Sequence, residues 1–164
     1  MVAAVTDTPT LEPALLVAND PVADGIGLAV FEAPQVAGAI APGQFVHLRI
    51  ATGTDFILRR PFSVYRARGG TIEVLYQVVG RGTGVLAGAV PGTPMDLIGP
   101  LGTGWHIPGG ARRALLVAGG LGIAPMGMLV EELARRGATV MLAQGAPTAD
   151  RLLARELFET LCER

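Results

Sequence analysis

The chain has 164 residues, of which 50% are hydrophobic and 16% are charged, so it can form one ordinary domain or two small ones with a buried core. Thirteen basic residues oppose fourteen acidic ones, and the net charge of -1 argues against a nucleic acid or an anionic membrane as the main partner. Every basic residue is arginine, which excludes a Walker A loop and a Schiff-base lysine.

The single cysteine, Cys162, excludes an internal disulfide and a multi-thiolate metal site, and it fits a reducing cytoplasm. No basic residue precedes an apolar run at the N-terminus, so we expect no secretory signal. Residues 114–130 are uncharged, but glycines and a proline interrupt them. We therefore expect a buried strand, a glycine turn and a helix start there, and no membrane span.

Short strands separated by turn signals are expected in the first hundred residues. In residues 44–50, Val46 and Leu48 alternate with His47 and Arg49, so His47 is predicted to be a surface strand residue and no catalyst. Regular spacing of such strands favours a six-stranded antiparallel barrel within residues 1–104. The predicted strands are residues 14–19, 27–31, 44–50, 62–66, 71–79 and 95–98.

The pattern changes to alternating strands and helices in residues 111–164. A continuous apolar run at 114–118 is typical of a parallel strand covered on both faces, and a helix, a strand at 139–143 and a helix from about Ala149 follow it. In the first helix, Glu131 and Glu132 stand four residues before Arg135 and Arg136, which predicts ion pairs. Two strands are few for an open sheet, so we expect an incomplete Rossmann-like parallel α/β domain.

Three motifs suggest a ligand. Pro61 restricts the backbone between Arg60 and Ser63, so these side chains are either a preorganised pair of donors for a phosphate and a polar atom or a solvated strand entry. The glycine-rich corner at residues 80–83 either approaches a diphosphate or forms a tight turn. The glycine turn at 119–125 opens a helix as in nucleotide sites, although Pro125 breaks the usual spacing.

Together these motifs resemble the ferredoxin reductase superfamily of flavoproteins, and within it the electron transfer subunits of NAD-dependent dihydroorotate dehydrogenases. The resemblance rests on residues 60–63, 75–77, 80–83, 99–102 and 119–125. It implies an FAD-binding barrel followed by a nucleotide-binding domain for NAD. The implied cofactor contacts are Arg60, Pro61, Phe62, Ser63, Leu75, Tyr76, Gln77, Gly82, Thr83, Gly119, Gly120 and Gly122.

By the same resemblance, Arg60 holds the FAD diphosphate and Ser63 acts catalytically at the reactive edge of the flavin. The resemblance implies a partner subunit that contains FMN and oxidises dihydroorotate in pyrimidine biosynthesis. Electrons from this partner are expected to pass first to FAD and then to NAD. The family also carries an iron-sulfur cluster held by four cysteines, which a chain with Cys162 alone does not supply. Pro147, where relatives often have arginine, favours NAD over NADP.

Two other interpretations stay open. A reductase subunit of a ferredoxin- or hydrogenase-linked complex has a similar sequence over this span. A flavoprotein remnant that acts only as a docking module is the other alternative, and we expect it to be colourless and to bind no added FAD.

Overall fold

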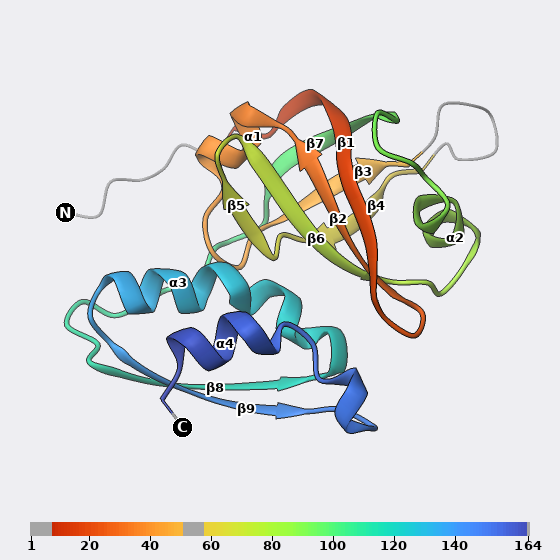
Figure 1. The fold of residues 1–164 in the computed structure, drawn as a ribbon. Coiled ribbons are helices and arrows are strands. Elements are labelled where there is room, and N and C mark those ends of the chain that lie inside the picture. The colour runs from red at the N-terminus through yellow and green to blue at the C-terminus, as the bar shows by residue number, and fades with distance from the viewer. Residues whose placement is uncertain (1–7, 51–57, 164) are drawn as a thin grey trace.

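A computed structural model describes residues 8–50 and 58–163 of the chain. The expectation of no secretory signal concerns the start of the chain, and residues 1–7 lie outside these ranges. The elements form two sheets, with α3 and α4 on the face of β8–β9 that is turned toward the larger sheet (Figure 1). Within the described ranges, no helix has both the length and the apolar character needed to span a membrane.

The larger sheet is antiparallel and has the strand order β4-β3-β7-β1-β2-β6-β5. Two short helices, α1 (Pro34–Ala39) and α2 (Arg81–Ala87), accompany it. The alternation predicted around His47 is confirmed, because Val46 and Leu48 are buried while His47 is half-buried. The strands are β1 (Thr10–Ala23), β2 (Ile26–Glu32), β3 (Phe45–Arg49), β4 (Arg60–Ser63), β5 (Arg66–Arg68), β6 (Thr71–Gln77) and β7 (Pro94–Leu101).

Among the described residues, this sheet has seven strands where six were expected, because the predicted strand at 62–66 is divided. The N–H of Val64 donates to Gln44 beside β3, whereas the N–H of Tyr65 donates to Glu73 of β6. The chain thus changes partner within one peptide and passes from one end strand of the sheet to the other. The two ends must lie close together, so the sheet is strongly curled. Its closure into a barrel stays a prediction.

β1 is longer than the predicted strand at 14–19, and Asp20 and Pro21 lie inside it. Proline removes a donor from a strand, and Pro21 is accommodated next to a register shift between β1 and β2. Glu12 of the same strand is buried, and its carboxylate accepts the N–H groups of Gln35 and Val36 at 2.9 Å each. β1 therefore fixes the start of α1, a helix that the sequence did not predict.

The smaller sheet contains two parallel strands, β8 (Arg113–Gly119) and β9 (Thr139–Gly145), as predicted. A 3₁₀ helix (Gly120–Met126) and then α3 (Gly127–Arg135) follow β8. The expectation that both faces of β8 are covered is wrong for the described residues, because Leu115 and Val117 are 64% and 67% exposed. The helices cover only one face, and a continuous apolar run does not reveal how many faces a neighbour covers.

The last helix, α4 (Arg155–Leu161), begins later than the predicted Ala149. Residues 149–151 form one 3₁₀ turn, and Ala154 then adopts a left-handed conformation with φ of 57°. Leu153 is 3% exposed between these segments, so the chain leaves the helical path where Leu153 enters the core.

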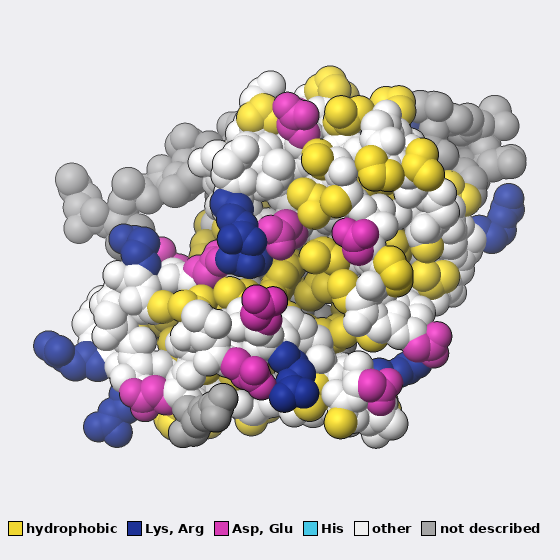
Figure 2. Space-filling model, in the orientation of Figure 1, with side chains coloured by type: hydrophobic (Ala, Val, Ile, Leu, Met, Phe, Trp, Pro, Cys, Tyr) yellow, Lys and Arg dark blue, Asp and Glu magenta, His cyan; other side chains and the backbone are white. Residues whose placement is uncertain are grey.

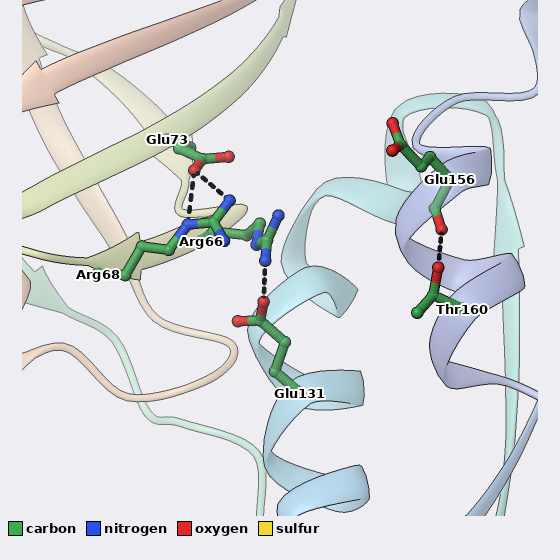
Figure 3. Close-up of polar contacts among 6 residues, drawn as sticks. All are labelled: Arg66, Arg68, Glu73, Glu131, Glu156 and Thr160. Carbon is green, nitrogen blue, oxygen red and sulfur yellow. Dashed lines mark hydrogen bonds and ion pairs between the residues drawn. The ribbon is translucent and has the colours of Figure 1, made fainter.

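A cleft of about 920 Å³ lies between the larger sheet on one side and the later turns of α3 and α4 on the other (Figure 2). One of the two ion pairs predicted within α3 is wrong, because Glu131 pairs across this cleft with Arg66 of β5 (Figure 3). The other prediction is confirmed, since Arg136 donates to Glu132 at 2.6 Å, and Arg135 joins the same carboxylate at 2.8 Å. Helical spacing shows which pairs are possible and does not show which partner is nearer in space.

Replacing Glu132 with glutamine is expected to remove stability that depends on pH. Hydrogen bonds from Arg135 and then Arg136 lower the pKa of Glu132 from 4.5 to about 2. Because the folded pKa is below the unfolded one, the stabilisation is complete above about pH 4.5 and is lost as the pH falls towards 2. The two arginines are exposed, so solvent screens the pairs and we expect about 1 kcal/mol or less.

Chemical unfolding of the wild type and Glu132→Gln measures this effect at pH 7 and pH 2.5. The difference in unfolding free energy is expected to shrink at the lower pH. A difference that is equally large at both pH values would contradict the assignment.

Candidate functional site

A cavity of about 430 Å³ opens where β4, the end of β6 and the start of α2 meet the 3₁₀ helix after β8. Its volume is within the range of small-molecule sites. Seven of the predicted cofactor contacts line it, and they come from three separate motifs of the sequence. The lining residues are Arg60, Pro61, Phe62, Tyr76, Gln77, Val79, Gly80, Arg81, Gly82, Thr83 and Leu121.

The side chain of Arg60 lies against the glycine corner. A Cβ atom placed on Gly82 would stand 3.3 Å from Nε of Arg60 and 3.7 Å from its Nη2. A side chain at Gly82 would thus press on the guanidinium, which also donates to the carbonyl of Leu58. The strand that carries Arg60 is fixed by pairing with β3, so the cation is held beside a backbone corner that has no side chain in the way.

Thr83 stabilises this corner from within. Its Oγ1 accepts the N–H of Val79 at 2.9 Å and the N–H of Gly80 at 3.2 Å. These bonds fold the chain sharply between β6 and α2, which turns Gly82 towards Arg60. The corner is thus preorganised by its own sequence. Gly82 and Thr83 both line the cavity, and their contact with a phosphate stays a prediction.

Tyr76 forms part of the cavity wall and is held by two contacts. Its hydroxyl donates to Oδ1 of Asn19 at 2.8 Å, and Nδ2 of Asn19 donates to the carbonyls of Leu86 and Ala89 at 2.8 and 3.0 Å. Its ring covers Gly27 on the opposite strand, where a Cβ would stand 2.5 Å from the ring. Burial raises the pKa of Tyr76, so the hydroxyl stays protonated and remains a donor.

The variant Tyr76→Phe is expected to lower the free energy of unfolding by about 1 kcal/mol, because it removes one hydrogen bond and leaves Oδ1 of Asn19 without this donor. A double-mutant cycle with Asn19→Ala measures the coupling by urea unfolding. We expect the two losses to be clearly non-additive. Strict additivity would show that the bond contributes nothing.

Five predicted contacts lie outside the cavity lining. Ser63 is half-buried at the end of β4, opposite Phe45, and Leu75 is 5% exposed in a core shared with the smaller sheet. The remaining three are Gly119, Gly120 and Gly122. They flank Leu121, which lines the cavity, so the glycine turn lies at its edge. The roles of all five toward a cofactor stay predictions.

Four further residues line the cavity without having been predicted as cofactor contacts, although each lies next to or within a predicted motif: Val79, Gly80, Arg81 and Leu121. The support that Asn19 gives to Tyr76 was also not predicted. Asn19 lies on β1, which is separated from β6 and Tyr76 by β2 alone. A search for a polar residue on that strand could have found it. Within the described ranges, no group of three His, Cys, Asp or Glu side chains is arranged to hold a metal ion.

This fold is that of the ferredoxin reductase-like flavoproteins. It matches an NADH-dependent reduced ferredoxin-NADP oxidoreductase with a TM-score of 0.80 and 28% identity, over 90% of this chain and 54% of that one. It also matches the ferredoxin reductase of carbazole 1,9a-dioxygenase with a TM-score of 0.78 and 21% identity, over 94% and 49% of the two chains. No protein-family model matches the sequence.

Among curated proteins, the chain is similar in sequence to the electron transfer subunit of dihydroorotate dehydrogenase B (NAD(+)). It is 40% identical to the subunit of Desulforamulus reducens over 118 residues, which are 71% of this chain and 45% of the relative. It is 35% identical to that of Geobacillus sp. over 143 residues, or 85% and 56%. The resemblance seen in the sequence is confirmed, and the chain spans about half the length of these relatives.

Proposed function

We propose that this chain is the FAD-binding part of an electron transfer subunit that passes electrons from a dihydroorotate-oxidising FMN subunit to NAD. The observation that carries the proposal is the guanidinium of Arg60 against Gly82 in an open cavity. A cation beside an unobstructed backbone corner fits a diphosphate, which the bidentate geometry of arginine recognises well. The homology to subunits of this name supplies the reaction class.

In this proposal, Arg60 binds the FAD diphosphate, and Gly82 and Thr83 let the phosphates approach the backbone. Pro61, Phe62, Tyr76 and Gln77 hold the ring system and ribityl chain, with Leu75 behind them. Bound FAD would supply the redox chemistry, accepting and releasing electrons in ones or twos. Ser63 would offer its hydroxyl to the reactive edge of the flavin.

We also propose that Gly119, Gly120 and Gly122 face NAD, because their turn borders the same cavity through Leu121. Residues 1–104 would then be the flavin part and residues 111–164 the beginning of the nucleotide part. A cluster held by four thiolates does not fit this chain, whose one cysteine is Cys162, so no electron step is assigned to such a cluster here. A cytoplasmic location follows from the proposed pathway.

Titration of the purified chain with FAD tests the proposal, with FMN as the comparison ligand. We expect FAD to be retained through gel filtration with the absorbance bands of a bound flavin. FMN, which lacks the adenosine and the second phosphate, is expected to be lost. A colourless protein that takes up neither flavin would reject the proposal and leave only the docking module.

A second candidate is a reductase component that serves ferredoxin, which the 28% identity to the ferredoxin-NADP oxidoreductase favours. Both candidates predict FAD binding, so the electron donor must separate them. FAD on this chain is expected to be reduced by dihydroorotate in the presence of an FMN-containing dihydroorotate-oxidising subunit. Reduction by reduced ferredoxin alone would favour the second candidate.

A further inference from the structure

The first turn of α3 is pressed against the segment that joins β4 to β5. A Cβ atom placed on Gly127 would stand 2.3 Å from the carbonyl oxygen of Tyr65, a distance that no real side chain tolerates. The N–H of Met128 donates to that same oxygen at 2.9 Å. Only glycine permits this approach, so residue 127 decides how closely the helix can lie on the larger sheet.

One helical turn further along, Glu131 forms the ion pair with Arg66 (Figure 3). Residues four apart lie on the same face of a helix, so Gly127 and Glu131 both face the sheet. The side chain of Arg66 is only 17% exposed, so this pair is less screened than those on the outer surface of α3. Two neighbouring residues of the sheet thus hold two successive turns of α3.

The boundary beyond α3 is more open. The cleft lies between Leu28 and Val30 of β2 on one side and Leu157 and Leu161 of α4 on the other, and Figure 2 shows it as a hollow with charged side chains around it. α4 is therefore not packed tightly against the larger sheet. Closer contacts lie beside the start of α3, where Tyr65 shares a core with the 3₁₀ helix.

Both sides of this contact lead directly to the candidate site. Tyr65 and Arg66 follow the strand that carries Arg60 and Ser63, and α3 follows the glycine turn that brings Leu121 to the cavity. We propose that Gly127, the Tyr65 carbonyl and the Arg66–Glu131 pair form an anchor, the α3 anchor, that sets the spacing between bound FAD and NAD. The inference rests on the proposed function, and its members are positioning residues.

Hydrogen exchange tests the anchor without any cofactor. In Gly127→Ala and Glu131→Gln, amides of residues 128–133 are expected to exchange at least about tenfold faster, while those of β1 and β2 stay unchanged. Exchanging the charges, in Arg66→Glu with Glu131→Arg, is expected to restore protection. Glu156→Gln, which removes an exposed carboxylate from the same cleft, is the matched control and is expected to change nothing.

The FAD-loaded chain then tests the positioning role. Both single variants are expected to keep the wild-type affinity for FAD while NADH reduces the flavin at least about tenfold more slowly, as a small misplacement of reacting groups would cause. Unchanged exchange would overturn the anchor, and faster exchange with an unchanged reduction rate would overturn its role. If the wild type held no FAD, the proposed function would fail, and the exchange pattern would still decide on the anchor.

Discussion

Replacing Arg60 with alanine is expected to weaken FAD binding by about 10- to 100-fold while the fold survives. A hydrogen-bonded contact to a charged group contributes about 1.5–3 kcal/mol, and each 1.4 kcal/mol is a factor of ten in affinity. Arg60 is half-buried, lies against the corner at Gly82 and is the one cation that β4 carries. Isothermal titration with FAD measures the affinity, and far-UV circular dichroism checks the fold.

The matched control is Arg59→Ala, which removes the same charge one residue earlier. Arg59 points towards β7, where it forms an ion pair with Asp96 and donates to the carbonyl of Asp96 at 3.2 Å. We expect this variant to lose some stability and to keep its affinity for FAD. Equal losses of affinity in both variants would mean that net charge, and no specific contact by Arg60, attracts the ligand.

Replacing Glu12 with alanine is expected to lower the free energy of unfolding by about 3 kcal/mol. Its carboxylate accepts two backbone N–H groups at the start of α1, and each such charged bond contributes about 1.5–3 kcal/mol. The N–H of Val36 is buried, so without Glu12 it has no access to water as a substitute. Urea unfolding followed by circular dichroism measures the loss.

Glu12→Gln separates the charge from the shape of the side chain. The amide keeps one oxygen acceptor, so one of the two N–H groups loses its partner and we expect most of the loss to remain. Glu32→Gln on the exposed end of β2 serves as the control, with a change within about 0.5 kcal/mol. A wild-type unfolding midpoint for Glu12→Gln would contradict the capping role.

Local pattern was enough to predict much of the fold. The alternation around His47 was visible because burial of one face imposes a fixed period on the sequence. The parallel pair β8–β9 was visible because strands and helices alternate along residues 111–164. Features that depend on a remote partner were missed. Nothing near Glu12 in the sequence indicates that it caps α1, and nothing near Glu131 indicates Arg66, because both partners are brought together by other strands.

In the candidate site too, features set by local sequence were predicted and features that depend on remote residues were missed. Arg60 and the corner at Gly82 were each predicted from local sequence to contact a phosphate, and the structure places the two side by side. The wall formed by Tyr76 depends on Asn19 and Gly27, which belong to strands earlier in the chain, so no local motif contains all three. Leu121 was missed because it lines the cavity only after the smaller sheet docks on the larger one.

By itself, the sequence determined the chemical groups: an arginine before a proline, a glycine corner closed by Thr83 and a glycine turn after an apolar strand. Periodicity and turn residues act over a few positions, and these features need nothing more. The tertiary structure alone decided that α3 rests on Tyr65 and that Glu131 pairs with Arg66. Such contacts depend on how the curled sheet and the helices pack against each other. The distances between segments that are remote in the sequence cannot be derived from any short stretch of the chain.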